Sequence, residues 1–204
     1  MISIVDYGLG NIRAFQNMYK RMNIDAVAVR TADELRGAER VLLPGVGAFD
    51  HAMELLDASG MRETLDEIVL EKGVPVLGVC VGMQILAEAS EEGTRPGLGW
   101  IKGTVRHFRS APQAQGLMLP HMGWNDVAPK PGAALFGGFD EAVRFYFLHS
   151  FYFDCANEED VSARAEYGVD FACAVSRGAI HGVQFHPEKS HHFGARLLKN
   201  FAEL

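Results

Sequence analysis

The sequence predicts an α/β fold built on a mainly parallel central sheet. In the first half of the chain, short apolar runs alternate with segments whose apolar residues recur at helical spacing. One run, residues 74–79, is wholly apolar, which is typical of a strand buried on both faces in a parallel sheet. After residue 92, Gly and Pro punctuate shorter, β-rich segments, which indicates extra antiparallel strands in the second half.

The expected elements of the first half follow from this alternation. We expect strands over residues 2–5, 26–29, 41–43 and 74–79. A helix is predicted where Ile12, Phe15, Tyr19 and Met22 share one face. Thr31 and Glu34 form a capping-box pattern for a short helix. Further helices are expected over residues 61–72 and from residue 81 to about residue 89.

The second half is expected to be richer in strands. The β-rich segments are residues 99–108, 144–153, 161–165, 171–175 and 179–185. The last stretch, residues 190–204, has a helical pattern with one apolar face. We find no internal repeat and no linker, so we expect one domain over residues 1–204.

Composition narrows the class of protein. Of 204 residues, 48% are hydrophobic and 22% are charged, which is ordinary for a globular domain. The net charge of −7 argues against a polyanion such as nucleic acid as the partner. Asp6 comes too early for a signal peptide, and no stretch is long enough to cross a bilayer. The three cysteines (Cys80, Cys155 and Cys173) are far apart, which suits a reducing compartment, and we expect a cytoplasmic protein.

The pattern Gly78-Val79-Cys80-Val81-Gly82 follows an apolar strand and precedes a helical segment. A nucleophile at such a turn stands exposed above the sheet edge, and the helix N-terminus favours a thiolate. The N–H of Val81 is then placed to hold an oxyanion. A buried structural cysteine is the alternative, because free cysteine is usually a small core residue.

The pattern His186-Pro187-Glu188 places a base and a carboxylate two residues apart. In an extended segment both side chains point to one side, roughly 6.5 Å apart along the chain. A carboxylate beside an imidazole fixes its orientation and stabilises its protonated form, which a thiol nucleophile needs from its base. The alternative is a surface His and Glu at the end of an edge strand.

A third pattern, residues 44–47, ends another apolar strand with two glycines in four positions. Gly45 and Gly47 let the backbone approach a ligand and turn its N–H groups inward. A plain loop is the alternative. Strand ends at one edge of a parallel sheet commonly assemble sites, so the three patterns are candidates for one site.

Other sites are less favoured. The segment Gly8-Leu9-Gly10 lacks the third glycine of a dinucleotide fingerprint, since Arg13 stands there. His186, His191 and His192 lack the companions of a known metal pattern, so we expect no metal and no cofactor. A stand-alone cysteine hydrolase and a catalytically silent binding subunit remain as functions of other classes.

Several further motifs run the length of the chain. They are I-V-D-Y-G-L-G-N, P-G-V-G-A-F, G-V-C-V-G-M-Q, S-E-E-G, P-H-M-G-W-N, F-L-H-S-F-Y and H-P-E-K-S. Together they resemble the class I (triad) glutamine amidotransferases, and most closely the HisH-type glutaminase subunits of imidazole glycerol phosphate synthase. The resemblance implies a flavodoxin-like fold and a glutaminase that feeds ammonia to histidine biosynthesis.

The resemblance also implies roles for individual residues. Cys80 resembles the nucleophile, His186 the general base and acid, and Glu188 its orienting carboxylate. The oxyanion segments are Gly45, Val46, Gly47 and Val81, and the peptide of the loop is expected to flip before it donates. The residues implied in glutamine binding are Gln84, Glu92, His149, Ser150 and Phe151. Val81 replaces the more familiar Leu, which leaves the required backbone N–H in place.

The implied partner is a HisF-type (β/α)₈ synthase subunit in a heterodimer. Asn11, Trp124 and Lys189 resemble positions that face it. Residues 97–100 and 186–194 look more like a HisH paralogue associated with O-antigen sugar biosynthesis. The sequence therefore leaves open whether the ammonia serves the histidine pathway or the amidation of a sugar.

Overall fold

The computed structural model describes residues 1–139 and 142–204, and its centre is a parallel sheet. Five neighbouring strands run parallel in the order β2 (Ala26–Val29), β1 (Ile2–Val5), β3 (Val41–Gly45), β4 (Val76–Cys80) and β12 (Ile180–Val183). Every residue of β1, β3, β4 and β12 is buried, including the polar Ser3 and His181, as expected for strands covered on both faces. The α/β class and the parallel centre are therefore confirmed.

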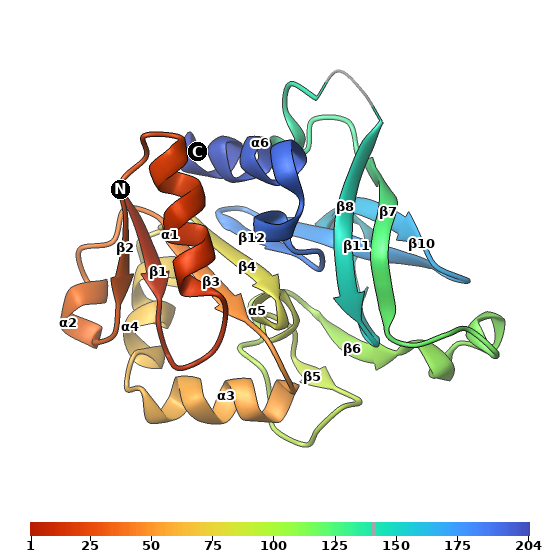
Figure 1. The fold of residues 1–204 in the computed structure, drawn as a ribbon. Helices are drawn as coiled ribbons and strands as arrows, with labels where there is room; N and C mark the ends of the chain where they lie inside the picture. The colour runs from red at the N-terminus through yellow and green to blue at the C-terminus, as the bar shows by residue number, and fades with distance from the viewer. Residues whose placement is uncertain (140–141) are drawn as a thin grey trace.

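Antiparallel strands extend this sheet on the β12 side. They follow in the order β11 (Asp170–Arg177), β10 (Val161–Glu166), β7 (His121–Pro129) and β8 (Val143–His149). A branch holds β9 (Phe151–Cys155), β6 (Gly103–His107) and β5 (Ala89–Ser90). Figure 1 shows β7 and β8 as an arm to the side of the parallel half.

Helices cover the parallel half of the sheet (Figure 1). They are α1 (Ile12–Arg21), α2 (Ala32–Leu35), α3 (Phe49–Ala58), α4 (Arg62–Asp66), α5 (Val81–Gln84) and α6 (His191–Ala202). A π-helical turn, Glu67–Glu71, continues α4, so the helix expected over residues 61–72 is present. The capping box expected for α2 is half present: Glu34 N donates to Thr31 Oγ1 (3.3 Å), but the Glu34 carboxylate accepts from Arg30 N (2.7 Å) in place of the N-cap N–H of Thr31.

The helix expected from residue 81 to about residue 89 is wrong in its length. The α-helix ends at Gln84. Beyond it the backbone is held by another segment, because Leu98 N donates to Ile85 O (2.8 Å) and Gly99 N donates to Ala87 O (3.0 Å). These tertiary hydrogen bonds replace the helical ones, although the apolar spacing continues.

The structure corrects one further expectation and contains two elements that were not expected. The single strand expected over residues 144–153 is two strands, β8 and β9, which are separated at Ser150. Helix α3 and strand β7 were not predicted, although the buried face of α3 has the regular spacing of Phe49, Ala52, Met53 and Leu56. No helix among the described residues is long and apolar enough to cross a membrane.

Candidate active site

Cys80 stands on a strained turn between β4 and α5. Its backbone has φ 56° and ψ −114°, in the region that L residues rarely adopt. The two flanking glycines are required by space: a Cβ on Gly82 would lie 1.9 Å from Leu43 O, and one on Gly78 would lie 2.4 Å from Gly82 O. Strain of this kind persists where the surrounding packing fixes it, and it is concentrated at functional sites.

His186 follows β12 and reaches the same edge of the sheet. Its Nδ1 lies 2.9 Å from Oε1 of Glu188, and the two side chains are 4% and 3% exposed. The surface pair considered as an alternative is therefore wrong. The expected extended geometry is also corrected, because Glu188 lies in a 3₁₀ turn, Pro187–Lys189. An Nδ1–H that donates to the carboxylate leaves Nε2 for Cys80.

The electrostatics of this cluster favour a charged imidazole. Burial lowers the pKa of His186, but hydrogen bonds to Cys80 and Glu188 and their negative charges outweigh it and raise the pKa to about 10. A protonated His186 beside the sulfur stabilises the thiolate, which is the nucleophilic form of cysteine. The second carboxylate oxygen of Glu188 is buried and has no hydrogen-bond partner among the described residues.

Strand β8 holds the backbone of His186. His186 N donates to Tyr146 O (2.9 Å), and Tyr146 N donates to Ser190 Oγ (3.0 Å). Ser190 Oγ in turn donates to His186 O (2.6 Å). These three hydrogen bonds form a closed bracket around the catalytic segment, and Ser190 is a positioning residue that the sequence did not reveal.

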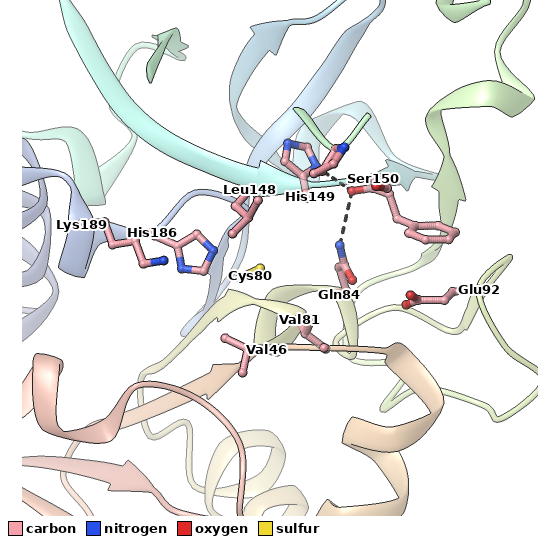
Figure 2. A pocket seen from close by; sticks show the side chains of 13 residues that line it. Val46, Cys80, Val81, Gln84, Glu92, Leu148, His149, Ser150, His186 and Lys189 are labelled. Atoms are coloured by element: carbon pink, nitrogen blue, oxygen red, sulfur yellow. Dashed lines mark hydrogen bonds between the residues drawn. The ribbon is translucent and has the colours of Figure 1, made fainter. Parts of the chain in front are cut away.

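A pocket of about 300 Å³ opens over Cys80. Among the predicted residues, it is lined by Val46, Gly47, Cys80, Val81, Gln84, Glu92, His149, Ser150, Phe151, His186 and Lys189. Figure 2 shows His186 and Gln84 on either side of Cys80. Pro120 and Leu148 also line the pocket and were not predicted, whereas Gly45 and Glu188 lie outside its lining.

Two glutamines hold the floor of the pocket. Gln84 Nε2 donates to Phe151 O (3.3 Å) and to Oε1 of Gln184 (3.0 Å). Gln184 is fully buried, and its Nε2 donates to Cys80 Sγ at 3.8 Å. Sequence reasoning missed Gln184, although it precedes His186 by two residues and therefore points to the same side. Glu92 accepts a hydrogen bond from Phe49 N (2.8 Å) at the start of α3.

Two buried histidines, His149 and His121, support the pocket wall at Phe151. Nδ1 of His149 lies 2.7 Å from Phe151 O, so it donates, and its Nε2 accepts from His121 Nδ1 at 2.9 Å. Nε2 of His121 then accepts from Asn125 Nδ2 (3.3 Å). Burial lowers the pKa of His149 to about 3 and that of His121 to about 4. Both rings are therefore neutral at pH 7, and each tautomer follows from its partners.

Of the residues expected to face a partner, Lys189 lines the pocket, whereas Trp124 and Asn11 lie outside its lining. Trp124 is 39% exposed and stacks on the ring of His191, with centroids 5.5 Å apart. Lys189 lines the pocket and places Nζ 5.7 Å from the ring centroid of Tyr146. Asn11 is exposed at the start of α1 and follows Gly10, where a Cβ would lie 2.7 Å from Pro44. Asn11 is thereby placed beside the loop over residues 44–47.

The described residues contain no group of three His, Cys, Asp or Glu side chains that could hold a metal ion. Of the three histidines weighed for such a site, His186 bonds to Glu188 and His191 stacks on Trp124.

Comparison with known proteins identifies the family. The family described as glutamine amidotransferase class-I matches residues 3–204. Imidazole glycerol phosphate synthase subunit HisH of Bdellovibrio bacteriovorus is 60% identical over 204 residues, which is all of both chains. The subunit of the same name from Leptospira borgpetersenii is 50% identical, and subunit HisH 2 of Pseudomonas aeruginosa is 45% identical, each over all of both chains.

Solved structures agree with the fold. A crystal structure of a glutamine amidotransferase superposes with a TM-score of 0.77 at 24% identity, covering 99% of this chain and 97% of that one. At this identity the likeness concerns the fold, and it confirms the expected class I amidotransferase architecture. The full-length sequence matches carry the assignment further: the chain belongs to the class-I glutamine amidotransferase family and, within it, to the HisH group.

Proposed function

We propose that this protein is the glutaminase subunit of imidazole glycerol phosphate synthase. It hydrolyses glutamine to glutamate and ammonia, and it passes the ammonia to a HisF-type (β/α)₈ synthase subunit in a heterodimer. The observation that carries the proposal is the buried Cys80–His186–Glu188 cluster at the base of the pocket. The HisH name of relatives that match the whole chain supports the pathway.

The reaction follows from the placement of these groups. The Cys80 thiolate attacks the amide carbon of glutamine, and the carbonyl oxygen becomes an oxyanion near the N–H of Val81. His186 gives its Nε2 proton to the leaving nitrogen, so ammonia departs and a glutamyl thioester remains. Neutral His186 then takes a proton from water, whose oxygen attacks the thioester and releases glutamate and the thiolate. Glu188 keeps the imidazole in one orientation throughout.

The pocket offers complementary groups for the rest of the substrate. Glu92 brings a carboxylate suited to the α-ammonium group of glutamine. Both N–H groups of Gln84 are engaged with Phe151 O and Gln184, so Gln84 can meet the α-carboxylate only by releasing one of these hydrogen bonds when glutamine binds. Ser150 and Phe151 supply backbone to the wall, which the hydrogen bond from His149 to Phe151 O holds rigid. A rigid wall favours glutamine because its amide must be presented to Cys80 in one geometry.

A synthase subunit is proposed to dock on the outer face of β7 and β8. Met122 and Trp124 on β7 pair with Leu148 and Tyr146 on β8, so all four share this face. Met122 is 66% exposed, which is unusual for a large apolar side chain near a pocket mouth. Leu148 also lines the pocket, so a subunit docked here covers the route by which ammonia leaves. Covering that route matters because free ammonia is protonated at neutral pH and is lost to water.

Residues 1–204 are proposed to act as one domain in the cytoplasm. All three cysteines are free, which suits a reducing compartment. Trp100, one of the positions that resembles the sugar-pathway paralogue, donates to Asp66 Oδ1 (2.7 Å) and is 4% exposed. Its role is structural, so it does not favour a different ammonia acceptor.

The pathway is tested in a histidine auxotroph that lacks its own glutaminase subunit and keeps its synthase subunit. We expect the wild-type gene to restore growth without histidine or added ammonium, whereas the Cys80→Ala gene does not. If the gene does not restore growth but the purified protein hydrolyses glutamine, the ammonia acceptor is assigned to the amidation of a sugar instead. A purified protein that hydrolyses no glutamine, with or without a synthase subunit, would contradict the glutaminase itself and favour a silent binding subunit.

A further inference from the structure

Tyr7 carries a buried hydroxyl with nothing to bond to. Its side chain follows β1 and is 5% exposed. Its Oη has no hydrogen-bond partner among the residues that the structure describes. A buried hydroxyl that gives up water without gaining a partner destabilises the fold, so its presence calls for a reason.

The hydroxyl lies next to Gly45, the residue before the pocket-lining Val46. A Cβ built on Gly45 would stand 3.1 Å from Tyr7 Oη and 2.6 Å from Gly82 N. Tyr7 Oη and the start of α5 therefore both lie close to Gly45. It does not line the pocket, whereas Val46, the next residue of the loop, does.

The Tyr7 hydroxyl keeps its proton, so it can take part in a hydrogen bond only in its neutral form. Burial, and then the negative charge on Cys80, raise the pKa of Tyr7 well above its ordinary value. The neutral hydroxyl therefore persists across the physiological range. What it lacks is an acceptor on the loop side.

The geometry of one peptide supplies that acceptor. The carbonyl of Gly45 and the N–H of Val46 belong to the same planar unit and point in opposite directions. When the N–H of Val46 turns into the pocket to meet the oxyanion, the carbonyl of Gly45 turns away from the pocket. The Tyr7 hydroxyl stands 3.1 Å from the position of a Cβ on Gly45, so a Gly45 carbonyl that turns toward Tyr7 meets it. Gly45 and Gly47, the latter with φ 99°, give this segment the freedom to turn.

We propose that Tyr7 is a positioning residue whose hydroxyl donates to the Gly45 carbonyl and stabilises the loop orientation in which Val46 N–H faces the oxyanion. This inference rests on the proposed glutaminase function and deepens it. Tyr7 touches no substrate and acts through the loop. In the structure the hydroxyl has no partner among the described residues, so it is available for this hydrogen bond.

Removing the hydroxyl tests the inference, and the chain provides a matched control. Tyr19 is also fully buried, and its Oη also has no partner among the described residues, but it lies on the core face of α1. Tyr7→Phe and Tyr19→Phe therefore delete the same atom from similar surroundings. For each, kcat and KM for glutamine are measured alone and with a HisF-type subunit carrying an acceptor analogue, and Tm is measured by calorimetry.

We expect Tyr7→Phe to lower the ratio of stimulated to unstimulated kcat about tenfold. KM should stay close to wild type because the substrate's own contacts remain. Tm should not fall, because the resting hydroxyl makes no hydrogen bond. Tyr19→Phe should keep both rates and the ratio.

Three results would overturn the inference. Equal stimulation of Tyr7→Phe and wild type would show that the hydroxyl has no part in the active loop. A parallel fall of both rates with a lower Tm would assign Tyr7 a merely structural role. A wild-type rate that the synthase subunit leaves unchanged would remove the two loop states while leaving the glutaminase intact. A wild type that hydrolyses no glutamine at all contradicts the proposed function instead, and this inference falls with it.

Discussion

Nδ1 of His186 lies 2.9 Å from Oε1 of Glu188, and Pro187 alone separates the two residues along the chain. The carboxylate holds the imidazole with Nε2 directed at Cys80, and burial keeps water from competing for either group. We therefore propose different duties for the two side chains: His186 moves protons, and Glu188 fixes the ring that moves them.

This division of duties predicts unequal losses. His186→Ala should lower kcat by about 10³-fold or more, because it removes the imidazole proposed to protonate the leaving ammonia. Glu188→Gln keeps the shape and one hydrogen bond, so it should retain at least about tenfold more activity than His186→Ala. Steady-state kcat values measure both. The reverse order of residual activities would refute the assignment.

The three cysteines should differ sharply in reactivity. Burial raises the pKa of Cys155 to about 12 and also raises that of Cys173, so both remain thiols at neutral pH. A chloroketone that mimics glutamine should therefore label Cys80 alone, as peptide mass spectrometry can establish. Excess glutamine should slow the labelling. A label on Cys155 or Cys173 that glutamine suppresses would show that the nucleophile is misassigned.

The outer face of β7 should dominate partner binding. Trp124→Ala removes a large, partly exposed aromatic anchor from this face, and such residues commonly cost about 2 kcal/mol or more. We expect Kd for a HisF-type subunit to rise by at least about tenfold in calorimetric titration. Leu70→Ala is the matched control, because Leu70 is 54% exposed on the π-helical turn after α4. Equal effects of the two substitutions would move the docking surface elsewhere.

Stability should fall in weak acid because of the buried neutral histidines. The folded-state pKa values of His149 (about 3), His121 (about 4) and His181 (about 4) lie below the ordinary value of 6.5, with burial as the main cause. Between pH 6.5 and about 4 the unfolded chain binds more protons, so the free energy of unfolding decreases as pH falls. For the fully buried His149 ring the loss is of order 1–2 kcal/mol by pH 5.

Urea unfolding at pH 7, 6 and 5 measures this loss. His186 contributes with the opposite sign and in another window, because its pKa of about 10 makes its stabilising contribution disappear as pH rises through that value. His181→Gln should flatten the dependence between pH 7 and 5, because it removes one of the buried neutral rings. A free energy of unfolding that is constant over this range would contradict the neutral buried rings.

The sequence predicted the parallel centre and the turn at Cys80 well because both are local. An apolar run between turn residues defines β4, and the crowding at Gly78 and Gly82 follows from one sharp turn. The helix after Cys80 was overextended because its end is set by hydrogen bonds from Leu98 and Gly99, which no local pattern shows.

The same reason explains which site residues were missed. Gln184 matters because it bonds to Gln84, a hundred residues away, and Ser190 matters because it bonds to Tyr146. Tyr7 stands in the opening motif, but its place against Gly45 appears only when β1 and β3 lie side by side. Motif spacing identifies groups that react, and tertiary contacts identify the groups that hold them.

The bracket formed by Tyr146, His186 and Ser190 has an evolutionary consequence. The ring of Tyr146 lies on the proposed docking face beside Lys189. The backbone C=O and N–H of Tyr146 bond to His186 and Ser190, in the segment that carries the proposed catalytic base. A surface substitution that shifts this strand therefore retunes turnover without altering a reacting atom. Selection on the interface and selection on the rate then act on the same residues. The sequences of the glutaminase and its synthase subunit should therefore diverge together. A synthase subunit from a distant lineage should stimulate this glutaminase less than its native synthase subunit does.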